Sequence, residues 1–176
     1  MNETVVQYIA RLTGYVGTTD PLAILESTPG KIAEVIRPAP QAVIDFKPSP
    51  AKWSIRQQVA HLADSEMVLN SRVRWAAAEP GKPIVAYDQD KWAATSRYDN
   101  IPVERSLVTF TAARQWLLAF VRQLTPAERE GYIEHEERGR ETISHLLKMI
   151  AGHDLNHLKQ IADLAKAGSS QASAEQ

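Results

Sequence analysis

Hydrophobic residues recur along most of the chain at intervals of three or four, which is the spacing of an amphipathic helix. The pattern predicts four long helices, near residues 22–36, 54–78, 102–124 and 142–167, and shorter helices at about 3–13 and 89–95. The helix at 54–78 has the clearest start, because Ser54 and Gln57 form a capping box, and Pro80-Gly81 marks its end. These segments predict an all-α fold, a four-helix bundle with a short extra N-terminal helix.

The segments between the predicted helices are rich in proline, glycine or polar residues. No segment alternates strictly between apolar and polar positions, so we expect no sheet. Residues 38–50 hold four prolines and should be mostly extended, and residues 83–100 form a long connection between the second and third long helices. Residues 132–140 should form a polar loop or a short extended piece.

Two further breaks are expected inside and after helices. Pro29-Gly30 should break or kink the helix near 22–36, and Gly168 should end the last helix. The segment that follows, 168–176, is rich in glycine, serine, alanine and glutamine and reads as a flexible tail. We therefore expect one domain over residues 1–167, followed by a tail.

Composition and charge exclude several classes of protein. The chain has no cysteine, which excludes a disulfide framework, a thiolate zinc site and a cysteine nucleophile. The formal net charge of −1 and the lack of a Lys/Arg cluster argue against a nucleic-acid partner. No apolar run approaches the roughly 20 residues of a membrane span, and residues 1–6 carry no basic signal segment. We expect a cytoplasmic protein that acts on a small molecule.

Two histidines near the end of the chain are spaced to bind one metal ion. His153 and His157 are four residues apart, so on a helix they lie about 40° apart and one turn along the axis. They fall at the edge of the apolar face, where a metal ion would lie beside a cleft and keep an open position. His61, at the edge of the apolar face of the 54–78 helix, is the candidate third ligand. The alternative is that these are half-buried histidines bonded to backbone groups.

Two acidic residues fall near the centres of apolar helix faces. Glu66 and Asp154 would each be buried there, and a buried carboxylate is costly unless it is paired. One interpretation is that each accepts the free ring N–H of a metal-binding histidine. The other is a hydrogen bond across helices to a Trp, Tyr or Arg side chain. Both are also weak candidates for a catalytic general base acting on water.

The remaining histidines are not expected to join the cluster. His145 lies about 80° around its helix from His153 and faces a different direction. His135 stands among the acidic residues of 134–137 and is interpreted as a solvated surface histidine, with a minor alternative of lining the cleft.

The aromatic residues divide between packing and candidate function. Trp53 precedes the capping box and is interpreted as a packing anchor, and Trp116 and Phe120, four residues apart, are assigned to the core. The long connection holds three more aromatic residues, Tyr87, Trp92 and Tyr98. They could wall the metal cleft, form a dimer contact or simply pack, since a long connection in a small domain is often functional.

Three sequence blocks together resemble the DinB/YfiT-like superfamily. They are KWSI at 52–55, VAHLADSE at 59–66 and, about ninety residues later, IAGHDLNHLKQI at 150–161. The resemblance spans roughly residues 20 to 167 and implies an up-down-down-up four-helix bundle. It also implies that His61, His153 and His157 bind one divalent metal ion, nickel or zinc foremost, and that the protein forms a homodimer.

The resemblance implies an activity less sharply than a fold. Some family members are thiol S-transferases or isomerases that use a low-molecular-weight thiol, and many others carry only a metal-dependent hydrolase label. We therefore expect a metal-dependent enzyme, with thiol transfer ranked ahead of hydrolysis on the resemblance alone. The alternative is a non-catalytic bundle in which the ion serves binding or interaction.

Overall fold

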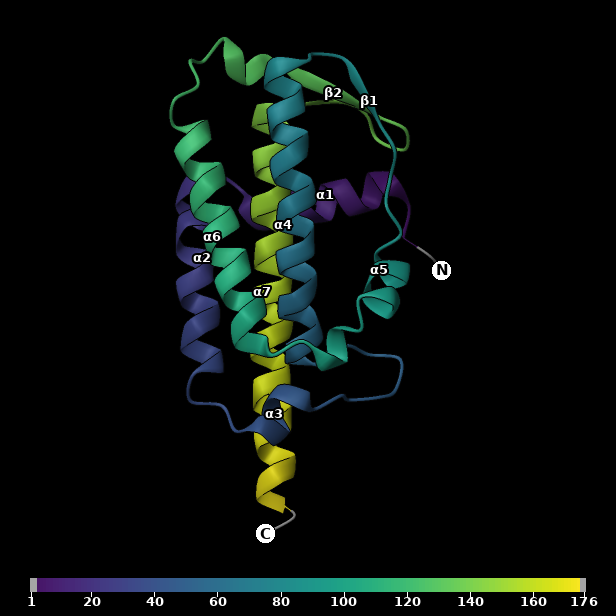
Figure 1. Ribbon diagram of the computed structural model, residues 1–176, viewed down its shortest axis with the longest axis vertical. Helices are drawn as coiled ribbons and strands as arrows, with labels where there is room; N and C mark the ends of the chain where they lie inside the picture. The colour runs from purple at the N-terminus through teal and green to yellow at the C-terminus, as the bar shows by residue number, and fades with distance from the viewer. Residues whose placement is uncertain (1–2, 175–176) are drawn as a thin grey trace.

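Four long helices run along one axis in the computed structural model, which describes residues 3–174 (Figure 1). They are α2 (Pro21–Ile36), α4 (Ile55–Ala78), α6 (Val103–Val121) and α7 (Ile143–Ala174). Figure 1 shows α2 and α7 descending while α4 and α6 ascend, which is the predicted up-down-down-up order. Each long helix packs against two others, so that α2, α7, α4 and α6 close a ring. None of the helices in the described part of the chain has the length and apolar character of a membrane span.

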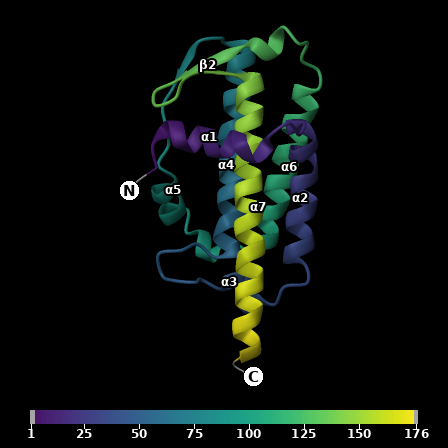
Figure 2. The ribbon, with the colours of Figure 1, turned by 180° about the vertical axis from the view of Figure 1, so that it is seen from behind.

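Shorter helices surround this bundle. Helix α1 (Val5–Val16) crosses the outer side of α7 at a steep angle, as Figure 2 shows from behind. Helix α3 (Gln41–Asp45) lies in the proline-rich connection, and α5 (Gln89–Thr95) lies in the long connection between α4 and α6. Two 3-10 turns, Tyr98–Asn100 and Glu128–Glu130, complete the helical elements. The proline-rich segment is therefore less extended than predicted.

A small three-stranded sheet covers one end of the bundle, so the expectation of no sheet is wrong. Strand β2 (Tyr132–His135) lies in the centre, parallel to β1 (Lys82–Ile84) and antiparallel to β3 (Gly139–Thr142). Strands of three or four residues are too short to give a readable alternation, and β1 is remote from β2 in sequence. The sheet matters for the site because it carries His135 toward the bundle.

The helix ends agree only partly with the sequence signals. Ser54 and Gln57 form the predicted capping box at the start of α4. The sequence predicts a break or a kink at Pro29-Gly30. Helix α2 is continuous through Pro29, so the break does not occur. Helix α7 continues through Gly168 to Ala174, so its predicted end is wrong. A Cβ atom at Gly168 would lie 3.1 Å from Cβ of Phe46, so the glycine serves close packing and not termination.

The bundle core consists of two hydrophobic clusters with a polar layer between them. The cluster nearer the sheet includes Leu25, Val73, Leu117 and Ile150. The other cluster includes Ile32, Leu62, Phe110 and Ile161. On α4, α6 and α7 the charged residues between the two clusters are Glu66, Arg114 and Asp154, each 1% exposed. The candidate site lies at the level of this layer.

Candidate metal centre

The three predicted histidines meet in the folded chain. One ring nitrogen from each of His61, His153 and His157 lies within 4.8 Å of the others. Nε2 of His153 is 3.1 Å from Nε2 of His61 and 3.0 Å from Nε2 of His157. His61 comes from α4, and the other two come from successive turns of α7. The geometry of the predicted triad is therefore confirmed.

The protonation of these rings suits a metal ion. Burial lowers the pKa of His61 to about 3 and that of His153 to about 4, with nearby imidazoles and arginines as smaller causes. Burial also lowers the pKa of His157 well below its ordinary value. All three rings are then neutral near pH 7, and a neutral imidazole has one nitrogen lone pair to offer to an ion. Ligands bound at about 2.0–2.1 Å in adjacent positions lie roughly 3 Å apart, as two of these pairs do.

Gln58 and Trp53 fix the orientation of the rings. Oε1 of Gln58 lies 2.5 Å from Nδ1 of His157, and an amide oxygen can only accept. The proton of His157 is therefore on Nδ1, which leaves Nε2 free to bind an ion. The Trp53 ring centroid lies 5.0 Å from that of His61, which confirms Trp53 as a packing anchor. Sequence analysis missed Gln58, whose only signal is its position three residues before His61.

Glu66 and Asp154 are buried as predicted, and both bind Arg114. Nε and Nη2 of Arg114 donate to Glu66 at 2.8 Å each, while Nη1 and Nη2 donate to Asp154 at 2.6 and 3.1 Å. Nη1 also donates to the carbonyl oxygen of Leu25, at 2.9 Å, so one guanidinium joins all four long helices. Burial opposes the charge of Arg114, but the two carboxylates raise the pKa of its guanidinium. The structure therefore shows the second interpretation of these acids, a hydrogen bond across helices to an arginine, and not a bond to a histidine ring.

Arg114 was not singled out in the sequence, although a signal exists. It lies four residues after Phe110 and three before Leu117, on the apolar face of α6. Neither Glu66 nor Asp154 lines the cavities beside the histidines. Their geometry thus assigns them to the polar layer of the core and gives no support to a general-base role.

Two cavities flank the three histidines, and His153 lines both. The larger, of about 340 Å³, is also lined by His61, Ser65 and Tyr87, and the smaller, of about 300 Å³, by Gln58 and His157. Oγ of Ser65 lies 2.8 Å from the Tyr87 hydroxyl and 3.3 Å from Nε2 of His61. Tyr87 therefore lines the metal cleft, as one of the sequence interpretations proposed.

Helix α1 closes both cavities on the outer side. Its residues Tyr8 and Leu12 line the larger and the smaller cavity alike. A Cβ atom at Gly152 would overlap the carbonyl group of Leu12, so the glycine permits α1 to lie directly on the backbone of α7. The glycine that precedes His153 therefore positions the wall of the site.

The other two histidines behave differently from each other. His135 is 2% exposed and lines the larger cavity, so its interpretation as a surface histidine is wrong and the minor alternative, that it lines the cleft, is confirmed. The reason is the sheet, because β2 turns His135 inward while its acidic neighbours Glu134 and Glu136 are exposed. His145 lies outside the cluster, as predicted, with Nε2 3.9 Å from Glu141.

The other aromatic residues divide between surface and core. Trp116 is 67% exposed, so its assignment to the core is wrong, and its ring is covered by the guanidinium of Arg74 at 5.5 Å. Phe120 is half-buried and packs on the core cluster nearer the sheet. Tyr98 is buried and donates to Asp64 at 2.6 Å. Trp92 is 39% exposed and contacts Tyr87, with ring centroids 4.9 Å apart.

Comparisons with known proteins agree with this geometry. Residues 24–161 match the DinB superfamily. A relative from Oceanobacillus iheyensis, named “Putative metal-dependent hydrolase”, is 34% identical over 114 residues, or 65% of this chain and 66% of the relative. A relative of the same description from Bacillus mycoides is 28% identical over 156 residues, or 85% of this chain and 90% of the relative.

A solved structure shows the same fold. YfiT from Bacillus subtilis, described as having “an unusual four-helix bundle topology”, matches with a TM-score of 0.78 at 23% sequence identity. The match covers 84% of this chain and 85% of YfiT. YfiT shares the fold, and the family match over residues 24–161, which is more than half of the chain, shows that the chain belongs to the DinB superfamily.

Proposed function

We propose that His61, His153 and His157 hold one divalent metal ion, nickel or zinc, and that the loaded protein hydrolyses a small-molecule substrate. The observation that carries the proposal is a cluster of three neutral imidazoles, two buried and that of His153 half-buried, beside two cavities. Among the described residues no aspartate, glutamate or cysteine belongs to this cluster, which leaves positions on the ion open to substrate. A divalent ion so held supplies Lewis-acid chemistry, polarising a carbonyl group and making water nucleophilic near neutral pH.

Side chains around the histidines define what the protein itself contributes. Gln58 holds the proton of His157 on Nδ1, and the Trp53 ring packs against His61 at an interplanar angle of 52°. The hydroxyl pair of Ser65 and Tyr87 lies beside His61, where it can donate a hydrogen bond to a substrate oxygen. These contacts orient the metal ligands and provide a polar partner for the substrate in the larger cavity.

Hydrolysis is now preferred to thiol transfer. The relatives whose names mention a reaction are named as metal-dependent hydrolases, and no residue of the cavities selects a thiol. Transfer from a low-molecular-weight thiol remains a prediction that the same experiment tests. A non-catalytic metal-binding bundle remains the competing proposal.

Metal analysis of untagged protein tests the first half of the proposal. Wild type should retain about one nickel or zinc ion per chain, and His61→Ala and His157→Ala should lose it. The matched control is His145→Ala, a histidine on the same helix outside the cluster, which should keep the metal. Full occupancy in both cluster variants would refute the site.

Rate measurements test the second half. Loaded protein, chelated protein and His153→Ala should be compared on ester and amide substrates, with and without several low-molecular-weight thiols. The proposal expects turnover that needs the metal and His153 and does not need a thiol. A strict thiol requirement would favour S-transfer, and inactivity under every condition would favour the non-catalytic bundle.

A further inference from the structure

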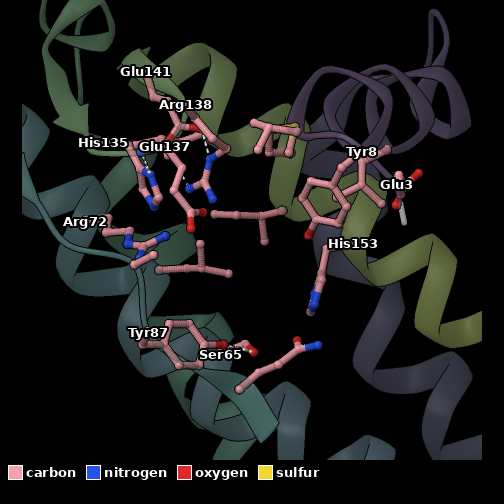
Figure 3. A pocket seen from close by; sticks show the side chains of 18 of the residues that line it. Glu3, Tyr8, Ser65, Arg72, Tyr87, His135, Glu137, Arg138, Glu141 and His153 are labelled. Atoms are coloured by element: carbon pink, nitrogen blue, oxygen red, sulfur yellow. Dashed lines mark hydrogen bonds and ion pairs between the residues drawn. The ribbon is translucent and has the colours of Figure 1, made fainter. Parts of the chain in front are cut away.

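Two buried hydrogen-bond donors face the larger cavity without a partner. Arg72 of α4 is 4% exposed and His135 of β2 is 2% exposed, and both line this cavity. Nε of Arg72 and Nε2 of His135 have no hydrogen-bond partner in the described part of the chain. Figure 3 shows both residues on one side of the cavity and His153 on the opposite side.

The positive charge of Arg72 is not balanced by an ion pair. Among the described residues its guanidinium makes one long hydrogen bond, 3.5 Å from Nη2 to the carbonyl oxygen of Val85. Its neighbour Arg138 is neutralised by Glu141, with contacts of 2.8 and 2.9 Å, and the other deeply buried arginine, Arg114, binds two carboxylates. Burying an unpaired charge is costly, so an anion bound beside Arg72 would stabilise its buried guanidinium.

The hydrogen bonds of His135 show that its free nitrogen is a donor. Nδ1 accepts a hydrogen bond from the backbone N–H of Glu137, at 3.2 Å. Burial, with Arg138 and Arg72 as smaller causes, lowers the pKa of His135, so the ring is neutral. Its single proton is then on Nε2, which is the unpartnered atom. The cavity is therefore lined by one guanidinium and one ring N–H that can donate hydrogen bonds to the same ligand group.

The cavity joins these donors to the three-histidine cluster. His61 and His153 line it together with Arg72 and His135, and Ser65 and Tyr87 lie on the wall that α4 and the following connection form. A small molecule in this cavity of about 340 Å³ can contact Arg72 and His135 as well as His61 and His153. We propose that Arg72 and His135 bind a carboxylate of the substrate, whose reacting carbonyl then faces the three histidines. This inference rests on the proposed function and names its substrate class as small carboxylic acids.

A carboxylate fits these donors better than a phosphate. The planar guanidinium matches the two oxygens of a carboxylate, and His135 adds one more donor. A dianionic phosphate would meet only one unbalanced positive charge, beside the acidic side chains of Glu137 and Glu141 that also line the cavity. The site therefore favours a singly charged, planar group.

Calorimetric titration of chelated protein tests the inference without metal or turnover. The probes are N-acetylglycine and N-benzoylglycine, each with its neutral amide, and inorganic phosphate. The acids should bind about tenfold or more tightly than the amides, because a charge-assisted hydrogen bond is lost in the amide. Arg72→Gln and His135→Phe should weaken binding of the acids and leave that of the amides unchanged.

Two variants separate binding from folding. Arg74→Gln changes an arginine on the same helix that does not line the cavity, and it should bind both acids as wild type does. Arg72→Lys keeps the charge without the planar fork and should bind with intermediate affinity. Because the buried charge of Arg72 lacks an ion pair, Arg72→Gln should melt at or above the Tm of wild type.

The inference fails under defined outcomes. Equal affinity for acid and amide, acid binding that survives Arg72→Gln, or no binding of either acid at about 10 mM would each overturn it. Tighter binding of phosphate than of both acids would overturn the assignment to carboxylates. Since the protein is chelated throughout, none of these results depends on whether the loaded protein is a hydrolase.

Discussion

Arg114 lies at the centre of the polar layer, and replacing it with methionine should strongly destabilise the bundle. Methionine fills much of the same volume but donates no hydrogen bond. The Arg114→Met variant loses all four contacts to Glu66 and Asp154 and the bond to the carbonyl oxygen of Leu25. Two carboxylates, each 1% exposed, then remain in the core without a cation.

The expected loss follows from that burial. Removing one partner of a buried ion pair costs about 3–5 kcal/mol, because the remaining charge is left without compensation. For a chain of this size, each kcal/mol lowers the Tm by about 2–4 °C, so the variant should melt roughly 6–20 °C below wild type. The exposed pair of Arg122 and Glu26, at 52% and 61% side-chain exposure on the same bundle, provides a contrast. Arg122→Met should cost less than about 1 kcal/mol.

The destabilisation should also depend on pH. Burial raises the pKa of the Glu66 carboxyl and Arg114 opposes this rise, so without Arg114 the folded-state pKa of Glu66 should lie well above its ordinary value. Between the unfolded and folded pKa values the folded state then binds more protons, so the free energy of unfolding falls as pH rises. The loss in free energy of unfolding caused by Arg114→Met should therefore be larger at pH 8 than at pH 5.

Urea unfolding followed by circular dichroism, with a chelator present, measures both effects. Adding Glu66→Gln and Asp154→Asn to Arg114→Met removes the two charges and should recover part of the loss and abolish its pH dependence. A loss below about 1 kcal/mol, or a loss that is the same at both pH values, would refute the dependence of the two carboxylates on Arg114.

Three other predictions concern the histidines, the α1 contact and assembly. Gln58→Leu should weaken zinc affinity about 10–100-fold, because His157 loses the acceptor that holds its proton on Nδ1, and competition with a chelating dye measures this. Gly152→Ala should cost about 1–3 kcal/mol in urea unfolding through overlap with Leu12, whereas Gly14→Ala, whose Cβ would meet no atom within 4 Å, should not destabilise. The homodimer expected from the family resemblance predicts a dimer mass in light scattering at micromolar concentration, and a monomer mass would contradict it.

Sequence reasoning placed the three histidines on their helices because the signals for each helix are local. The i, i+4 spacing of His153 and His157 survives in any helix, and the capping box at Ser54 fixes where the helix of His61 begins. Helical period then placed Glu66 and Asp154 in the core. These placements needed only the geometry of single helices. The meeting of His61 with the two histidines of α7 was implied by the family resemblance, and the structure shows it.

Features that depend on remote contacts were missed. His135 is turned inward by strand β2, which pairs with residues 82–84. No local sequence pattern predicts a pairing of only three residues. Trp116 has the spacing of a core residue with Phe120, yet it lies at the surface under Arg74. Arg72 was overlooked although it lies eleven residues after His61, which on a helix returns to nearly the same face.

The layer around Arg114 also determines how the helices align along their axes. The apolar layers on either side consist largely of leucine, isoleucine and valine, which can substitute for one another if a helix slides by one turn, about 5.4 Å. Such a slide would move Arg114 against apolar side chains. It would leave Glu66 and Asp154 buried without a counterion.

Among the alternative alignments of the bundle, the observed one pairs all three charges at once. Glu66 lies five residues after His61 on α4, and Asp154 directly follows His153 on α7. The same guanidinium binds both carboxylates. The positions of α4 and α7 along the bundle axis can therefore differ only by as much as these hydrogen bonds allow. That offset decides whether His61 reaches the other two histidines, so Arg114, which lines neither cavity beside them, helps to set the spacing of the three rings.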